Sequence, residues 1–385
     1  MLNLICRRNF CYVSKLHLLQ YHLCSSLSIS TPGYELENGN GNGDPFEVNY
    51  LSERLGFPRE CALKAYKVAK FKSSTNPDLV LAFLEEHGLS DTQIKRLIKL
   101  FPQILALKPQ GNLLRKIEFL RSLGMSRDDI VKIIMVAGNF MARSLENRII
   151  PNFNYMKDIL KSEKDAVDVI KRFPRLLYMD LQKTLRPNVD TLLDAGVLEV
   201  NVWRLFKHSP GTLLMGHDVS KAHVKRIAEM GINPESVTFV VGFGVMKSFT
   251  KSSWNKKIDV YKRWGYLEDH MLVAFRRHPQ CMAKSEDKID AVLDYIINTM
   301  GCDPATFITF PVMVSLSLKK TIIPRCSVYQ VLKSKGLLKS ASIVGFLRYS
   351  KRSFLDKFVL PFVDEVPELL ELYPCDLSPP EVRRC

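Results

Sequence analysis

Glycine recurs along this chain at a nearly constant interval, and no other feature restricts the possible folds as strongly. Successive members of the series are separated by 36, 72, 35, 34, 36 and 35 residues, and the gap of 72 equals two intervals with Leu160 at the missing place. The series consists of Gly88, Gly124, Gly196, Gly231, Gly265, Gly301 and Gly336. A period of this length is typical of a solenoid, in which each repeat packs only on its neighbours.

A second series, 14 residues after each of these places, has the same period. It consists of Pro102, Gly138, Pro174, Pro210, Val245, Pro279 and Ser350, and the shorter repeat after Gly301 has Pro311 ten residues on. Proline favours the end of a preceding helix, because it disfavours helical geometry in the residue before it. Each repeat is therefore expected to contain a turn that begins with proline.

Between each glycine position and the following proline position, apolar residues have the spacing of a helix, as in Ile94, Leu97 and Ile98. Two residues after the glycine positions stand Ser90, Ser126, Asn233 and Asp303, all of which are good N-cap residues. The one ambiguous apolar run, residues 237–245, is predicted to be helical from its place in the period. The sequence thus predicts an all-α solenoid of about eight repeats of 32–36 residues, with two helices and a proline turn in each.

Composition divides the chain into four parts. Residues 1–34 contain basic and serine residues but no Asp or Glu, which is typical of an organellar transit peptide. Arginine beside bulky apolar residues favours the mitochondrion; the chloroplast and a secretory signal are alternatives. Residues 35–45 hold an Asn-Gly alternation that predicts a flexible linker. We expect the repeat array over 46–354 and an acidic C-terminal cap over 355–385.

The positive charge is concentrated in the repeat array. Residues 51–354 contain 49 basic and 29 acidic residues, a balance of +20, whereas the whole chain carries +15. Such a field favours a polyanion as partner, and nucleic acid is the usual one.

Catalytic and metal-binding motifs are missing from the sequence. It has no Gly-x-Ser-x-Gly elbow and no His-x-x-x-His pair with a nearby Glu. Its nine cysteines form no Cys-x-x-Cys pair, which gives little support to structural zinc or a disulfide framework. No apolar run of 18 residues occurs, so no membrane span is expected. We expect a non-enzymatic monomer without cofactor or metal.

Basic residues recur between the proline turn and the following helix. In a superhelix, equivalent positions line one edge, so these residues predict a basic stripe that contacts the sugar–phosphate backbone. Helix N-termini nearby would add N–H donors. The candidate contacts are Arg148, Lys183, Arg186, Lys221, Lys225, Lys256, Lys257, Lys319, Lys320 and Arg325. The alternative is ordinary solvated charge at helix ends.

These motifs resemble the mitochondrial transcription termination factor (mTERF) family, and more narrowly its land-plant branch. The resemblance covers about residues 46–372 and is carried by Phe101-Pro102 with Phe119-Leu120 and Gly124, and by Phe173-Pro174 with Leu185-Arg186-Pro187 and Gly196. It implies a right-twisted solenoid of two α-helices and a short 3₁₀ helix per unit, with a positive groove. It also implies double-stranded DNA or RNA as the organellar partner, alongside other gene-expression proteins. The sequence departs from the pattern at Gly138, Leu160 and Val245.

Three functions are compatible with these features. The first is a double-stranded-DNA-binding regulator of organellar transcription, in termination above all. The second is an RNA-binding factor for intron splicing or RNA maturation. The third is a protein-binding helical scaffold, which would not need the charge of the array. A pentatricopeptide RNA reader has a similar period, but its unit lacks the Phe-Pro turn.

Overall fold

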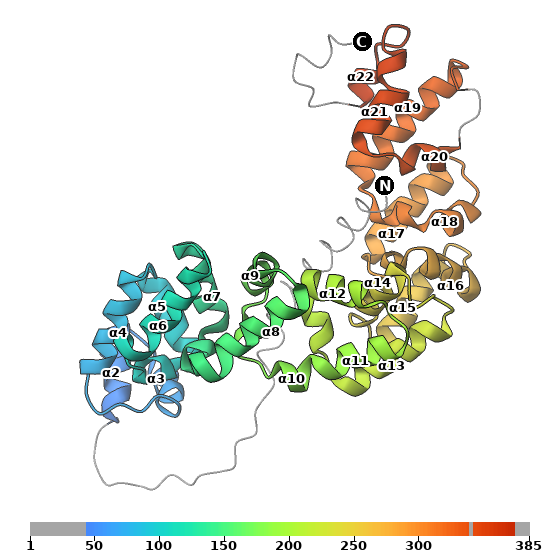
Figure 1. Cartoon of the computed structure of the whole chain (residues 1–385). Helices are drawn as coiled ribbons and strands as arrows, with labels where there is room; N and C mark the ends of the chain where they lie inside the picture. Colours follow the sequence, from blue (N-terminus) through green and yellow to red (C-terminus); the bar gives the residue numbers. More distant parts are fainter. Residues whose placement is uncertain (1–43, 339–341, 374–385) are drawn as a thin grey trace. The chain divides into compact units, whose positions relative to one another are not determined.

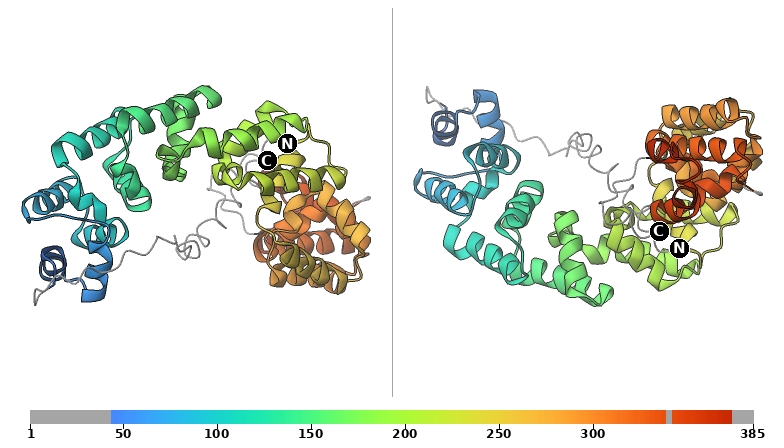
Figure 2. Two further views of the ribbon diagram at one scale, coloured as in Figure 1. Left: turned by 90° about the horizontal axis from the view of Figure 1, so that it is seen from below. Right: turned by 90° about the horizontal axis from the view of Figure 1, so that it is seen from above.

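The computed structural model describes residues 44–338 and 342–373, so the predicted transit peptide and nearly all of the predicted linker lie outside the described residues. These residues form helices and turns without any strand, which confirms the all-α prediction. They divide into two compact units: an N-terminal unit of residues 44–194 with 202–220, and a C-terminal unit of 195–201 with 221–373. Within each unit, helix pairs follow one another in chain order (Figure 1, Figure 2).

Each repeat consists of a first helix, a second helix and, in most repeats, a 3₁₀ turn. The first helices are α4 (Thr75–Glu86), α6 (Leu114–Ser122), α8 (Ile150–Leu160), α11 (Arg186–Asp194), α13 (His217–Glu229), α15 (Lys251–Lys262), α17 (Glu286–Asp294) and α19 (Ile323–Ser334). The second helices are α5 (Asp91–Leu100), α7 (Arg127–Ala137), α9 (Glu163–Arg172), α12 (Glu199–His208), α14 (Val237–Met246), α16 (Glu268–Arg277), α18 (Ala305–Thr309) and α20 (Ile343–Arg348).

Short turns and terminal helices complete the chain. The 3₁₀ turns are η2 (Pro102–Ala106), η4 (Gly138–Ala142), η6 (Pro174–Leu177), η7 (Pro210–Leu214), η8 (Pro279–Cys281) and η10 (Pro311–Ser315). Wider π-helical turns are η3 (Pro109–Leu113), η5 (Leu145–Ile149), η9 (Tyr295–Thr299) and η11 (Leu318–Ile322), and α10 (Leu181–Thr184) precedes α11. The terminal elements are α2 (Phe46–Leu55), α3 (Arg59–Tyr66), α21 (Lys351–Phe358), η12 (Leu360–Phe362) and α22 (Leu369–Leu372).

A residue with left-handed backbone geometry follows the first helix in every repeat. All glycines of the periodic series have positive φ, for example 73° at Gly124. A Cβ added to Gly124 would meet no atom within 4 Å, so the backbone angle, not space, favours glycine there. In the repeat without glycine, Lys161 takes this geometry, with φ 52°. The missing member of the glycine series was predicted at Leu160. That prediction was wrong by one residue, because the left-handed residue is Lys161.

A 3₁₀ turn forms even where glycine replaces proline, although ψ of the residue before it, Ala137, is only 33°. Phe101, Phe173 and Phe310 precede their turns with φ between −138° and −136° and ψ between 63° and 67°. Ala137 has φ −134° before Gly138, where an added Cβ would lie 2.5 Å from Cδ2 of Phe101. Close packing against that ring accounts for glycine in the proline position, and the turn there is preserved.

The repeat around Val245 differs more. Residues 237–246 form α14, as predicted, but no 3₁₀ turn links it to α15 in the described residues. The predicted cap at Asn233 was wrong, because Ser236 Oγ accepts the N–H of Phe239 and the helix begins three residues later. The caps predicted at Ser90 and Ser126 are confirmed, each with a reciprocal capping box.

A buried side chain near the start of the first helix closes each of several repeats. Asn152 Nδ2 donates to the carbonyl oxygens of Leu176, Leu177 and Met179 at 2.9, 3.2 and 2.8 Å. Asn76 and Asn188 donate in the same way to the ends of η2 and η7. The last carbonyls of a helical turn have no partner inside it, and burial without one would be costly. We call this contact the closing hydrogen bond.

Cations provide the closing hydrogen bond in the C-terminal unit. Lys257 Nζ donates to the carbonyl oxygen of Lys284 at 2.7 Å, and Lys288 Nζ to that of Ser315 at 3.3 Å. Arg325 Nη1 donates to Tyr349 at 2.8 Å, just after α20. The donor thus changes from amide to cation between the units, whereas the acceptor remains a main-chain carbonyl.

The last helices share one core with the final repeat. Phe354 and Leu355 of α21 pack with Val328 and Leu332 of α19 and with Phe346 of α20. The predicted boundary between residues 354 and 355 therefore falls inside α21. The described part of the acidic segment, residues 355–373, packs on the array through apolar side chains, and residues 374–385 lie outside the described residues.

The closing hydrogen bond can be tested at Asn152. Asn152→Ala leaves the buried carbonyls of η6 and Met179 without their donor, so we expect the free energy of unfolding to fall by about 1–3 kcal/mol. The measurement is chemical denaturation. The control is Asn154→Ala, an exposed residue on the same helix with the same gain in helix propensity, which should change stability by less than about 0.5 kcal/mol. Equal stabilities of the two variants would contradict the role given to Asn152.

Candidate nucleic-acid interface

Most candidate cations lie on the exposed surface near the start of a first helix. In the N-terminal unit these are Arg148 in η5, Lys183 in α10 and Arg186 at the start of α11. In the C-terminal unit the exposed candidates are Lys221, Lys225, Lys256, Lys319 and Lys320. Each unit therefore presents its own set of cations in the first two turns of a first helix or in the short turn before it, apart from Lys225, which is the ninth residue of α13.

N-cap residues position these side chains. Asp180 Oδ1 accepts the N–H of Lys183 at 3.3 Å, and Ser317 Oγ accepts the N–H of Lys320 at 3.2 Å. Ser144 does the same for Asn147 at 3.0 Å, one residue before Arg148. The capped residue is the third of the helix in each case, so the cations leave the backbone beside the positive end of the helix dipole.

Two candidates lie inside the protein. Lys257 and Arg325 are only 9% and 4% exposed, and both form closing hydrogen bonds. The guanidinium of Arg325 also lies 4.7 Å from the centre of the Phe354 ring. We assign both side chains to the repeat structure and leave them out of the proposed phosphate contacts.

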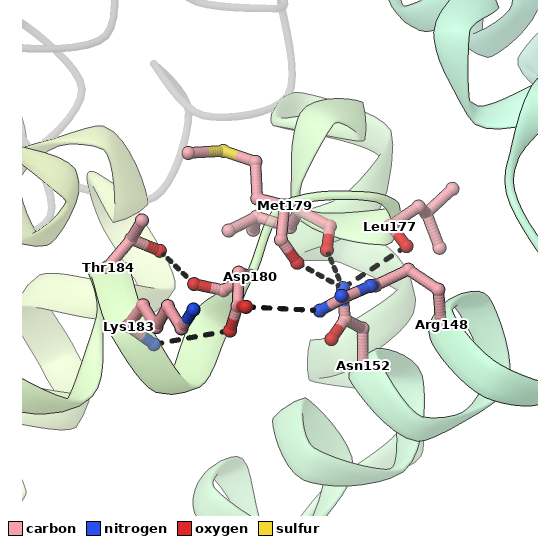
Figure 3. A network of polar contacts seen from close by, with 8 residues as sticks. Arg148, Asn152, Leu177, Met179, Asp180, Lys183 and Thr184 are labelled. Carbon is pink, nitrogen blue, oxygen red and sulfur yellow. Dashed lines mark hydrogen bonds and ion pairs between the residues drawn. The ribbon is translucent and has the colours of Figure 1, made fainter.

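Carboxylates interrupt both sets of cations. Arg148 Nη1 lies 3.7 Å from Asp180 Oδ2, and Arg186 Nε lies 3.8 Å from Asp190 Oδ2 (Figure 3 shows the first pair). In the C-terminal unit, α17 begins with the exposed acids Glu286 and Asp287. Exposed ion pairs are worth only about 0.2–1 kcal/mol, so an incoming phosphate can replace such carboxylates.

Sequence reasoning missed two cations at the end of the array. Lys351 and Arg352 begin α21 directly after the N-cap Ser350, whose Oγ accepts the N–H of Ser353 at 3.1 Å. Arg352 stands two residues after its cap, as Lys319 does, whereas Lys351 stands one residue after its cap and Arg148 four residues after Ser144. Ser350 belonged to the second periodic series, so the sequence already indicated that a repeat position, and with it a helix start, lies at this place. Arg352 also pairs with Asp356 at 3.1 Å.

Several titratable groups are buried away from this surface. Burial lowers the pKa of Lys284 to about 8, and the nearby Lys288 cation acts in the same direction. Burial likewise lowers the pKa of His278 to about 3, and its Nε2 lies 2.7 Å from Ser315 Oγ. Among the described residues, no group of His, Cys, Asp and Glu could hold a metal ion. No helix among residues 44–338 and 342–373 has the length and apolar character to cross a membrane.

Comparison with known protein families gives a direct match. The mTERF family model matches residues 81–291 and 140–355 of the chain. The chain belongs to the mTERF family. No curated protein matched it. The mTERF family comprises nucleic-acid-binding regulators of organellar gene expression, and this coarse function extends to the present mTERF protein.

The buried Lys284 predicts a pH dependence of stability. Its pKa is about 8 in the folded protein and about 10.4 in an unfolded chain, so between these values the unfolded state binds more protons. Stability should therefore rise as pH increases from about 8 to 10, and should stay level, as far as Lys284 is concerned, below about 8 where both states carry the proton. The measurement is chemical denaturation across this range, and Lys284→Met should show a smaller rise. An identical pH profile for parent and variant would contradict the prediction.

Proposed function

We propose that this mTERF protein, of the family's land-plant branch, binds double-stranded DNA through the sugar–phosphate backbone and regulates organellar transcription, above all its termination. The observation that carries the proposal is the repeated placement of exposed cations at the starts of the first helices, in both units of a chain of this family. Contacts of this kind position a protein on a duplex, because they neutralise phosphates and release counterions.

Three aromatic side chains of the C-terminal unit, Trp254, Tyr261 and Trp264, are engaged in contacts within that unit, which favours a duplex over an unpaired strand. Proteins that bind single strands stack bases on exposed aromatic side chains. Trp254 and Tyr261 are 6% and 0% exposed, and Trp264 Nε1 donates to Asp290 Oδ1 at 2.7 Å. These rings are part of the core and of repeat contacts, so they supply no stacking platform. This supports double-stranded DNA ahead of single-stranded RNA as the partner.

The contact role can be tested at Lys319 and Lys320. Each phosphate contact contributes about −0.9 to the slope of log affinity against log salt on B-DNA. Lys319→Ala/Lys320→Ala should therefore reduce the slope by about 1.8 units and weaken binding to all duplex sequences alike. The measurement is fluorescence anisotropy with a ~25 base-pair duplex at several salt concentrations, a length that exceeds two helical turns.

A matched control is Lys64→Ala/Lys67→Ala, which removes two exposed lysines at α3, away from the starts of the first helices of the repeats. It should leave the slope nearly unchanged. Equal slopes for both double variants would show that the lysines of η11 are ordinary solvated charge. Tighter binding to RNA than to DNA would favour the splicing or RNA-maturation function, and no binding to either polymer would favour the protein-binding scaffold.

We propose the mitochondrion as the location, on the composition of residues 1–34. About the first 35 residues, fused to a fluorescent protein, should direct it into mitochondria. A plastid signal would select the chloroplast instead, and a purely cytosolic signal would refute the transit-peptide prediction.

A further inference from the structure

We infer that Asp180 restrains phosphate binding in the N-terminal unit by occupying Arg148, so that the free protein is held below its full affinity for nucleic acid. This inference rests on the proposed function. It concerns one carboxylate that pairs with a cation of the proposed interface, and it assigns that carboxylate a regulatory role in addition to its structural one.

The contacts of Asp180 show both roles (Figure 3). Its Oδ1 accepts the N–H of Lys183 at 3.3 Å and caps α10, while its Oδ2 lies 3.7 Å from Arg148 Nη1. Its main-chain carbonyl accepts the Thr184 hydroxyl at 2.7 Å. The side chain of Asp180 remains 36% exposed and that of Arg148 39% exposed, so solvent and a ligand reach both groups.

Equivalent positions in other repeats carry a hydroxyl. Ser144, Thr250, Ser317 and Ser350 cap their helices and accept an N–H three residues on, at 3.0 to 3.2 Å. A hydroxyl is therefore sufficient for this cap. The negative charge of Asp180 is not required by the local structure, and its effect falls on the cations around it.

Those cations belong to the proposed interface. Lys183 is the residue whose N–H Asp180 caps, Arg186 begins the next helix, and Arg148 faces the carboxylate from the preceding repeat. A phosphate that approaches Arg148 therefore meets a carboxylate of its own sign beside that cation. It competes with that carboxylate for the Nη1 side of the Arg148 guanidinium, because one guanidinium edge cannot serve two anions at full strength.

The geometry is suited to such an exchange. The separation of 3.7 Å is longer than a direct charge-assisted hydrogen bond of about 2.7–2.9 Å, so the pair is a loose one. Asn152, one turn beyond Arg148, is held by three carbonyls, which keeps the start of α8 in place while the Arg148 side chain changes partner.

The test uses the full-length protein and a duplex DNA of ~25 base pairs, a little over two helical turns, with Asp180→Ser and the isosteric Asp180→Asn. Both residues retain an N-cap acceptor, so both variants should melt near the parent temperature. Each should bind DNA about 1.5- to 5-fold more tightly, the range that exposed ion pairs span. The salt slope should steepen by about 0.9, the value expected when one more phosphate is neutralised.

Two controls separate this exchange from a general change of net charge. Asp158→Ser removes the same charge from an exposed position on α8, ten residues from Arg148 and thus about 15 Å along the helix, where salt screens its effect. It should leave affinity unchanged. In a protein that already carries Arg148→Gln, Asp180→Ser should no longer increase the affinity for DNA. This double-mutant cycle isolates the contribution of the Arg148–Asp180 pair.

The outcomes distinguish the two proposals. A parent protein that binds neither DNA nor RNA overturns the proposed function. If the parent binds with a steep salt slope but Asp180→Ser and Asp180→Asn do not bind more tightly, Asp180 is a cap and nothing more. Equal increases in affinity from Asp180→Ser and Asp158→Ser would show a general charge effect and would equally overturn the inference.

Discussion

The closing hydrogen bond, from the start of a first helix to main-chain carbonyls at or after the end of its repeat, is the contact that most repeats share and on which their spacing depends. A repeat of two helices ends in carbonyls that face the interior and have no partner within their own turn. Asn152 meets three of them with one amide nitrogen. By joining residues 24 to 27 positions apart, this bond sets where the next first helix begins. The position of every surface group at that helix start follows from it.

Buried cations of the repeat and exposed cations of the proposed interface are consequently close neighbours in the sequence. Lys256 is exposed and Lys257 is buried, and Arg148 lies one helical turn before the closing residue Asn152. The same short segment closes the repeat with one face and presents cations with the other. The repeat period therefore spaces these exposed cations along the chain without a separate loop.

Much of this architecture could be predicted from the sequence, because its rules are local. Left-handed glycines, prolines at turn starts and hydroxyl caps act within a few residues, and they give the number and order of the helices. The rotation of each first helix against its turn is set by packing, so the sequence could not show that Lys257 points inward while Lys256 points outward. Asp180 was overlooked for a related reason, since aspartate is an ordinary cap and its contact with Arg148 comes from the preceding repeat.

A donor whose acceptors are main-chain carbonyls can change its charge without changing its partner. Asn188 and Lys288 illustrate both forms within one chain. Each exchange of amide for ammonium or guanidinium would shift the isoelectric point while the exposed face stays the same. Two proteins descended from one such array could thus differ widely in isoelectric point and still present identical surfaces to a ligand, so divergence in that property would be a poor measure of divergence in what they bind.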